Sequence, residues 1–135
     1  MTKPTYEIDG AAFWTLEEFF AEIGRKLIPG AEWGHNLDAF NDILRGGFGT
    51  PEGGFILHWR NAQLSRERLG HAEAVRHLRK ALRRNWWRGR EELKRALRCA
   101  QNGTGPTVFD WIVEIIRTHC PEGEEAEDGV ELVLD

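Results

Sequence analysis

The chain has 135 residues, 41% hydrophobic and 30% charged, which suits one domain spanning residues 1–135 and excludes a disordered or fibrous protein. No apolar run is long enough to span a bilayer, and the first residues lack the apolar core of a signal peptide. We therefore expect a soluble, cytoplasmic protein. Cys99 and Cys120 are too few for a disulfide scaffold and lack CxxC spacing, which favours two reduced thiols.

The net charge of −4 is distributed unevenly along the chain. Residues 60–98 contain thirteen Lys or Arg and four Asp or Glu, whereas the rest of the chain contains five basic and eighteen acidic residues. Such a division is typical of a molecule whose parts neutralise each other, or of one with partner surfaces of opposite sign. The charge alone does not decide between these two possibilities.

The first part of the chain predicts a strand, two helices and a second strand. Residues 5–8 alternate between polar and apolar side chains, as in a strand. Thr15 and Glu18 have the spacing of a capping box and precede an apolar stripe at helical spacing, which predicts the first helix. Asn36 is a favoured N-cap residue for a shorter second helix. Residues 55–59 form an apolar run that predicts a buried strand.

The second part predicts three helices and a last strand. Residues 72–100 indicate two basic helices that are interrupted near residues 85–89. Residues 108–117 place apolar side chains at helical spacing, and residues 130–134 alternate as a strand. This order predicts an α/β fold in which helices pack on a small three-stranded, mostly parallel sheet. The basic pair would be an extra helical hairpin within residues 72–105.

The sequence contains none of the residue patterns that would predict an enzyme. Its five histidines lack HExxH spacing and a CxxC partner, so we expect neither a metal site nor a cofactor. There is no GxSxG elbow, no Walker loop and no GxGxxG followed by a helix. The glycine-rich residues 46–49 follow a predicted helix and lack the Lys of a phosphate-binding loop, which favours a flexible connection.

The basic residues 79–98 offer an alternative function, nucleic-acid binding. This segment carries Trp86 and Trp87 between arginines, and proteins use cations with aromatic rings in this way to hold single-stranded nucleic acid. The segment also fits a solvated amphipathic hairpin whose tryptophans cover part of the core. Because the acidic remainder of the chain would repel phosphates, we do not expect nucleic acid as the partner.

A pair of aspartates on the second predicted helix suggests a protein-binding site. Asp38 and Asp42 are four residues apart and share one helix face, with Asn41 beside them. Like charges at this spacing weaken a helix by about 0.2–0.5 kcal/mol, and Asp42 lies beyond the first turn, where the helix dipole would help. The pair is therefore a candidate for binding a cationic partner. The alternative is a solvated face on which Asp42 pairs loosely with Arg45.

Residues 33–44 are Trp-Gly-His-Asn-Leu-Asp-Ala-Phe-Asn-Asp-Ile-Leu. They resemble the aromatic-Gly-x-Asn-Leu-Asp-Ala-x-x-Asp motif of the barstar family, the intracellular inhibitors of barnase-like microbial ribonucleases, and stretches such as Arg60-Asn61 resemble a longer barstar-like subgroup. The resemblance covers residues 5–60 and 107–135, which implies the family fold there and an insertion at residues 72–105. It also implies a non-enzymatic protein that forms a 1:1 complex with a basic extracellular-type ribonuclease or a nuclease toxin, away from membranes.

The resemblance also implies which residues contact the partner. In this family an acidic helix and its preceding loop block the cationic cleft where a ribonuclease binds RNA phosphates. Asp42 matches the central anchor of the motif and Asp38 its neighbour. The other partner-binding candidates are Trp33, Gly34, Asn36, Asn41, Gly46 and Glu114. Glu32 and Asn41 replace aromatic residues of the founding inhibitor, and Thr118 replaces a carboxylate, so the resemblance leaves the identity of the ribonuclease or toxin open.

Overall fold

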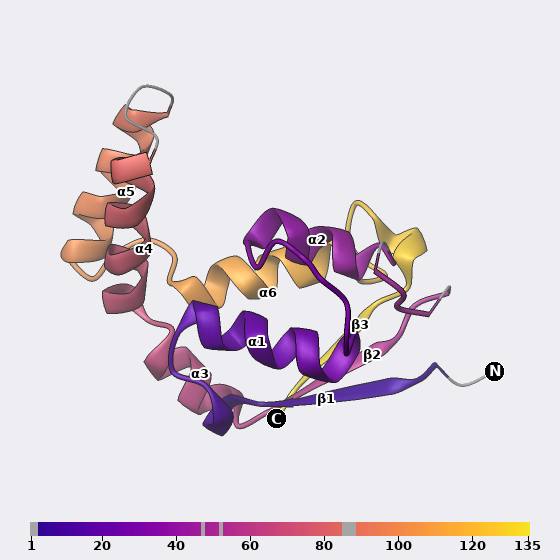
Figure 1. Ribbon diagram of the computed structural model, residues 1–135. Helices are drawn as coiled ribbons and strands as arrows, with labels where there is room; N and C mark the ends of the chain where they lie inside the picture. The colour runs from indigo at the N-terminus through magenta and orange to yellow at the C-terminus, as the bar shows by residue number, and fades with distance from the viewer. Residues whose placement is uncertain (1–2, 47, 52, 85–88) are drawn as a thin grey trace.

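The computed structural model describes the chain in four stretches: residues 3–46, 48–51, 53–84 and 89–135. Three parallel strands form one sheet in the order β1-β2-β3, with β1 at Thr5–Asp9, β2 at Ile56–Arg60 and β3 at Glu131–Leu134 (Figure 1). In the register Ile8 pairs with Trp59, and Leu57 pairs with Leu132. The predicted α/β class with a small parallel sheet is confirmed.

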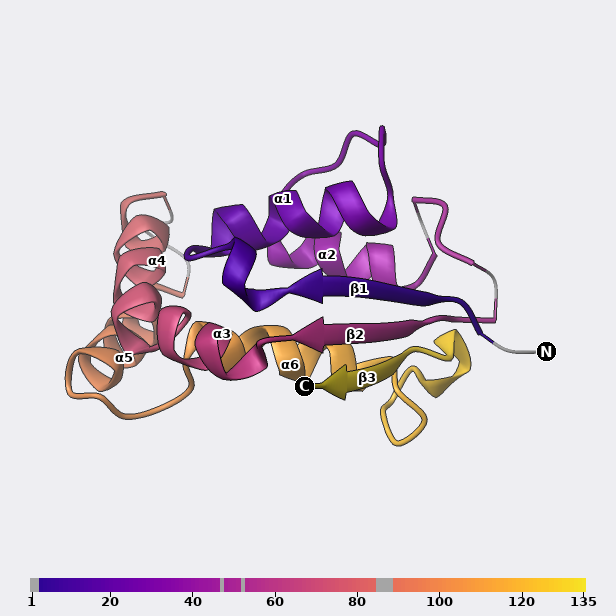
Figure 2. The same cartoon turned by 90° about the horizontal axis from the view of Figure 1, so that it is seen from below.

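Six helices of the described residues connect and cover the strands: α1 (Leu16–Leu27), α2 (Leu37–Leu44), α3 (Ala62–Arg68), α4 (His71–Arg84), α5 (Arg90–Gln101) and α6 (Val108–Thr118). Helices α1, α2 and α6 cover one face of the sheet, and Figure 2 looks onto the other face, in front of which no described helix lies. Parallel sheets are usually covered on both faces. Here the open face is mixed: Glu7 and His58 are register partners whose side chains lie 3.5 Å apart, and the exposed Val133 lies on the same face.

The core between the sheet and the helices is built around Trp59 of the central strand. Its side chain is fully buried and stacks on Phe19 at a ring-centroid distance of 5.4 Å. Phe109 of α6 lies 5.1 Å away on another side. The indole N–H donates a 3.0 Å hydrogen bond to Oγ of Ser65, so the polar atom of this buried ring is satisfied. The core thus joins β2 to α1, α3 and α6.

The elements lie close to their predicted positions, although one α-helix and two 3-10 helices, Gly10–Ala12 and Ala126–Asp128, were missed. The capping box is present, because Oγ1 of Thr15 accepts from the Glu18 amide at 3.1 Å and Oε1 of Glu18 accepts from the Thr15 amide at 3.2 Å. Helix α3 was not predicted, because Ala62 and Ser65 are its only buried side chains and no apolar stripe marks it. Its N-cap Asn61 also gives no cap hydrogen bond and has a left-handed backbone with φ of 54°.

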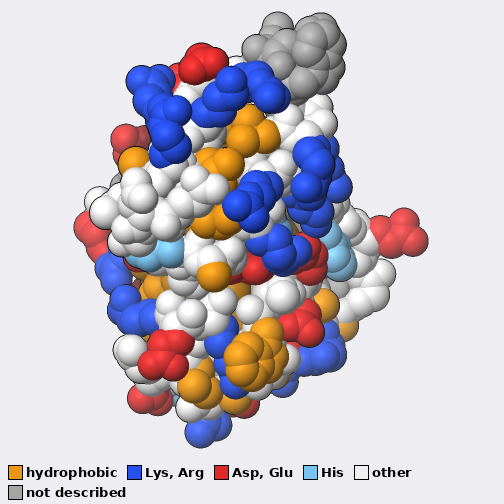
Figure 3. Space-filling view, turned by 90° about the vertical axis from the view of Figure 1, so that its left-hand side faces the viewer, with side chains coloured by type: hydrophobic (Ala, Val, Ile, Leu, Met, Phe, Trp, Pro, Cys, Tyr) orange, Lys and Arg blue, Asp and Glu red, His pale blue; other side chains and the backbone are white. Residues whose placement is uncertain are grey.

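Helices α4 and α5 form the predicted hairpin, which projects from the end of the molecule where α1, α2 and α6 begin (Figure 1). Lys and Arg side chains gather over this projecting part (Figure 3). The base of the hairpin belongs to the main core through Ala74, Leu78 and Ala100. Trp86 and Trp87, which the nucleic-acid alternative uses, lie outside the described residues. No described helix has the length and apolar character that a membrane span needs.

Candidate functional site

Close contacts between side chains and backbone define the shape of the loop before α2. The Trp33 ring packs edge-on against Phe20 with 5.6 Å between ring centroids, and it lies 4.5 Å from the His35 ring. His35 has a left-handed backbone with φ of 47°. A Cβ on Gly34 would lie 2.8 Å from Nδ2 of Asn36, closer than such atoms approach. A side chain at Gly34 would therefore displace the Asn36 amide.

Asn36 joins this loop to the helix. Its Oδ1 accepts a 2.8 Å hydrogen bond from the Ala39 amide, which caps α2 as predicted. Its Nδ2 donates to the carbonyl oxygen of Gly34 at 3.2 Å. Gly34 and Asn36 therefore help to fix the shape of the loop. Both residues are also exposed to solvent.

Asp38 and Asp42 are both exposed on α2, as their spacing predicts. The side chain of Asp42 is 58% exposed, and its Oδ1 accepts from Nη1 of Arg45 at 3.2 Å. Arg45 also donates to both carboxylate oxygens of Glu125, at 2.9 and 3.0 Å, and this hydrogen bonding raises the pKa of Arg45. The pairing of Asp42 with Arg45 that we considered is therefore present. Because Glu125 holds the guanidinium, Asp42 keeps most of its surface open to a second cation.

The side chain of Asn41 makes a hydrogen bond within the protein. Its Oδ1 lies 2.5 Å from Nε2 of His119, a fully buried side chain. Nδ1 of the same ring lies 2.6 Å from Oδ2 of Asp128. The ring therefore links α2 to the end of α6 and to the acidic loop before β3. Sequence analysis missed this contact, because a single His at a helix end carries no pattern that identifies its partners.

The last two candidates lie after the end of α2 and on the neighbouring helix α6. Gly46 has φ of 97° and its amide donates to the carbonyl of Ile43 at 3.0 Å, so it reverses the chain after the helix. Glu114 is exposed on α6, which packs beside α2 (Figure 1). The carboxylates of Asp38, Asp42 and Glu114 thus come from two neighbouring helices.

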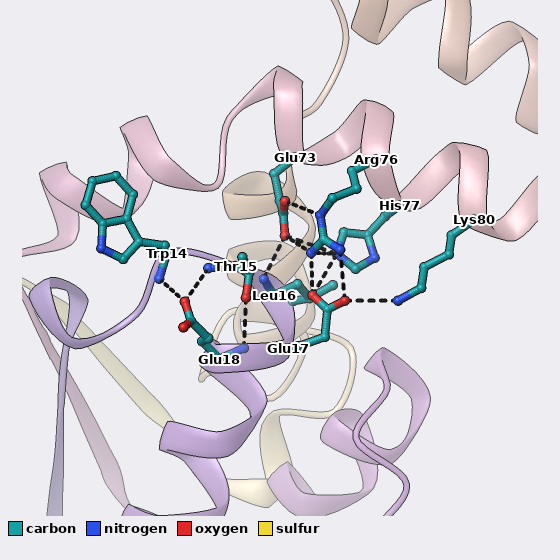
Figure 4. A network of polar contacts seen from close by, with 9 residues as sticks. All are labelled: Trp14, Thr15, Leu16, Glu17, Glu18, Glu73, Arg76, His77 and Lys80. Carbon is teal, nitrogen blue, oxygen red and sulfur yellow. Dashed lines mark hydrogen bonds and ion pairs between the residues drawn. The ribbon is translucent and has the colours of Figure 1, made fainter.

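A second polar cluster, which sequence analysis did not find, ties α4 to the start of α1 (Figure 4). Glu73 is 7% exposed and accepts from the Leu16 amide at 2.8 Å and from Nε of Arg76 at 2.8 Å. Burial acts to raise the pKa of Glu73, but these hydrogen bonds outweigh it and lower the pKa overall. The Arg76 guanidinium also holds the pKa of Glu17 well below its ordinary value, with a smaller contribution from Lys80.

Two groups contain the residue types of metal ligands: Glu17, Glu73 and His77 in one, and His119, Glu125 and Asp128 in the other. In the first group the Arg76 guanidinium already donates to both carboxylates. In the second, Arg45 donates to both oxygens of Glu125. Because a protein cation already pairs with at least one carboxylate of each group, we assign neither group a metal.

Comparison with known protein families identifies the family of the chain. The family model described as Barstar (barnase inhibitor) matches residues 3–100. The matched range includes the motif at residues 33–44 and continues through α4 into α5. No curated protein matches the chain. Since the family model covers most of its length, the chain belongs to the barstar family.

Proposed function

We propose that the protein inhibits a microbial ribonuclease by placing α2 and the loop before it in the cationic cleft of the enzyme. Family membership supports inhibition of barnase-like ribonucleases as the general activity. The observation that carries the proposal for this chain is the exposure of Asp38 and Asp42 on one face of α2. Asn36 holds the preceding loop against the same helix through its two hydrogen bonds.

The proposed mechanism is competition with RNA for the same cations. A ribonuclease binds RNA phosphates with Arg, Lys and His side chains, and two carboxylates at fixed spacing can take the place of two phosphates. Because the helix cap already orders the loop, little conformational entropy is lost on binding. Glu114 on the neighbouring helix would supply a third carboxylate. We further propose a 1:1 complex in the cytoplasm, which would keep the enzyme inactive inside the producing cell.

The proposal is tested with a panel of purified basic microbial ribonucleases that includes barnase, and with a dinucleotide substrate. We expect stoichiometric inhibition of at least one member. The double variant Asp38→Asn/Asp42→Asn should lose most of this inhibition, because the cleft cations are then left unpaired. The matched control Glu91→Gln/Glu92→Gln removes the same charge from exposed positions on α5 and should inhibit normally. Failure of the wild-type protein to inhibit any member would contradict the proposal.

Nucleic-acid binding by residues 79–98 is the alternative function. Five arginines favour it, because they are exposed on the hairpin: Arg79, Arg83, Arg84, Arg95 and Arg98. The dinucleotide separates the two functions. A protein that only covers RNA would protect a long RNA and leave the dinucleotide to be cleaved, whereas an inhibitor of the cleft protects both.

A further inference from the structure

A groove of about 370 Å³ lies between the loop before α2 and the helix α4. Its lining residues come from α1, from the loop before α2 and the start of α2, and from α4 and α6. Its floor is apolar and consists of Leu16, Phe20, Leu37, Leu78, Ala81 and Trp111. One wall carries His35, Asn36 and Asp38, and the other carries His77, Lys80 and Arg84, with Glu17 of α1 beside Lys80. The groove is therefore continuous with the loop and helix that we propose as the inhibitory surface.

The α4 wall is held firmly against the body. Arg76 donates to both Glu17 and Glu73, and Glu73 also accepts from the amide at the start of α1 (Figure 4). Lys80 is joined to Glu17 at 3.0 Å. Ala74 and Leu78 anchor the same helix in the core. These contacts fix the position of α4 on the rest of the protein and therefore set the width of the groove.

The two walls differ in charge. Asp38 and Arg84 face the same groove, yet no ion pair joins them. In the proposed complex Asp38 binds a cation of the ribonuclease and does not pair with Arg84, whereas a carboxylate of the enzyme can. Lys80 is paired with Glu17, whereas Arg84 is exposed and has no ion pair among the described residues. A cation at the edge of an interface with a basic enzyme is repulsive unless a carboxylate faces it.

We propose that this groove receives a segment from the rim of the ribonuclease cleft in which an apolar side chain neighbours a carboxylate. The apolar side chain lies on the groove floor, and the carboxylate pairs with Arg84. This inference rests on the proposed function and adds a selectivity to it. The protein binds ribonucleases whose rim is acidic at this point and rejects those whose rim is basic there.

The test uses the ribonuclease that the wild-type protein inhibits and compares two neighbouring arginines. Arg83 and Arg84 are both exposed in the last turn of α4, but only Arg84 lines the groove. Reversal to Glu changes the long-range charge equally in Arg83→Glu and Arg84→Glu, so a difference in dissociation rate reports the local contact. A third variant, Ala81→Phe, fills the groove without changing charge.

We expect Arg84→Glu to dissociate about tenfold faster than the wild type, and Arg83→Glu to stay within about threefold of it. Ala81→Phe should also dissociate about tenfold faster, while circular dichroism shows an unchanged fold. Equal rates for the two reversals, with normal binding by Ala81→Phe, would overturn the groove proposal and leave the inhibitor function standing. If the wild-type protein binds no ribonuclease of the panel, the proposed function fails, and the groove proposal fails with it.

Discussion

The motif residues fall into two groups with different physical roles. Gly34 and Asn36 shape the loop, because a side chain at Gly34 would collide with the amide that caps α2. Asp38 and Asp42 make few contacts of their own and stay exposed. A preorganised binding surface requires a loop held in one shape and exposed charges that add little to the stability of the free protein. The motif has both.

The variant Asn41→Ala tests whether this residue of the motif stabilises the fold. The substitution removes the acceptor for Nε2 of the buried His119. A buried polar group left without a partner costs about 1–3 kcal/mol, so we expect the free energy of unfolding in urea to fall by that amount. An unchanged unfolding free energy, with weaker inhibition, would show instead that Asn41 acts only on the partner.

The spacing of Asp38 and Asp42 could be predicted from the sequence, because it depends only on the helix period. Their electrostatic surroundings could not. Glu125 lies 80 residues from Arg45 in the chain, and His119 lies 78 residues from Asn41. Such pairs depend on how α2, α6 and the acidic loop meet in the folded protein, and no local pattern encodes that.

At the scale of elements, strong apolar periodicity and recognisable caps made most helices and strands predictable. The capping box at Thr15 and the N-cap at Asn36 are both formed. Helix α3 was missed because it has no apolar stripe and no side-chain cap. The attachment of α4 to α1 was also missed, since Glu17 and Glu73 are far apart in the chain and meet only through Arg76.

The attachment of α4 to α1 through Glu17 and Glu73 should make the free energy of unfolding depend on pH. The pKa values of Glu17 and Glu73 are lowered in the folded protein from an ordinary value of 4.5. The two carboxylates therefore contribute fully to the free energy of unfolding above about pH 4.5. This contribution is lost as the pH falls below that value, because the unfolded chain binds protons first. We expect Glu17→Gln to lower stability at pH 7 by about 0.2–1 kcal/mol and to weaken the pH dependence.

Urea unfolding at pH 7 and at pH 3 measures this effect. Glu124→Gln is the matched control, because Glu124 is an exposed carboxylate of the acidic loop. The control should follow the wild type at both pH values. If Glu17→Gln shows the same pH dependence as the wild type, the cluster does not hold α4 in place.

At the scale of the whole molecule, Lys and Arg side chains gather over the hairpin (Figure 3), and most acidic residues lie outside residues 60–98 of the chain. In the proposed complex a basic ribonuclease is attracted to the carboxylates of α2 and α6 and repelled by the hairpin. The salt dependence of association should report the sum of both effects, because exposed charges are screened over about 8 Å at physiological ionic strength.

Reversing hairpin charges away from the groove separates inhibition from RNA binding. Each reversal in Arg79→Glu/Arg83→Glu/Arg95→Glu makes the net charge, −4 in the wild type, more negative by two units. At low salt we expect association with a basic ribonuclease to become about two- to tenfold faster, with any retention of RNA lost. Stopped-flow kinetics and filter binding measure the two quantities. Loss of inhibition in a folded triple variant would place the inhibitory site on the hairpin.

The variant Asp42→Ala tests whether the carboxylate of Asp42 contacts cations in the ribonuclease cleft. The control variant is Glu91→Ala, because Glu91 is also exposed and is also paired with a cation three residues later, Lys94, at 3.6 Å. Truncation of a carboxylate that is buried against cations in a complex typically costs about 2–5 kcal/mol of affinity. In the free protein, loss of the exposed pair with Arg45 opposes relief of the repulsion from Asp38, so stability should change by less than about 0.5 kcal/mol.

The measurement is the dissociation constant of Asp42→Ala and of Glu91→Ala for the inhibited ribonuclease, with the unfolding free energy of each variant. The account predicts a loss of about 2–5 kcal/mol in affinity for Asp42→Ala alone, at nearly unchanged stability in both variants. Undiminished affinity of Asp42→Ala would contradict it and remove α2 from the mechanism. Unfolding of Asp42→Ala together with loss of binding would make Asp42 a structural residue.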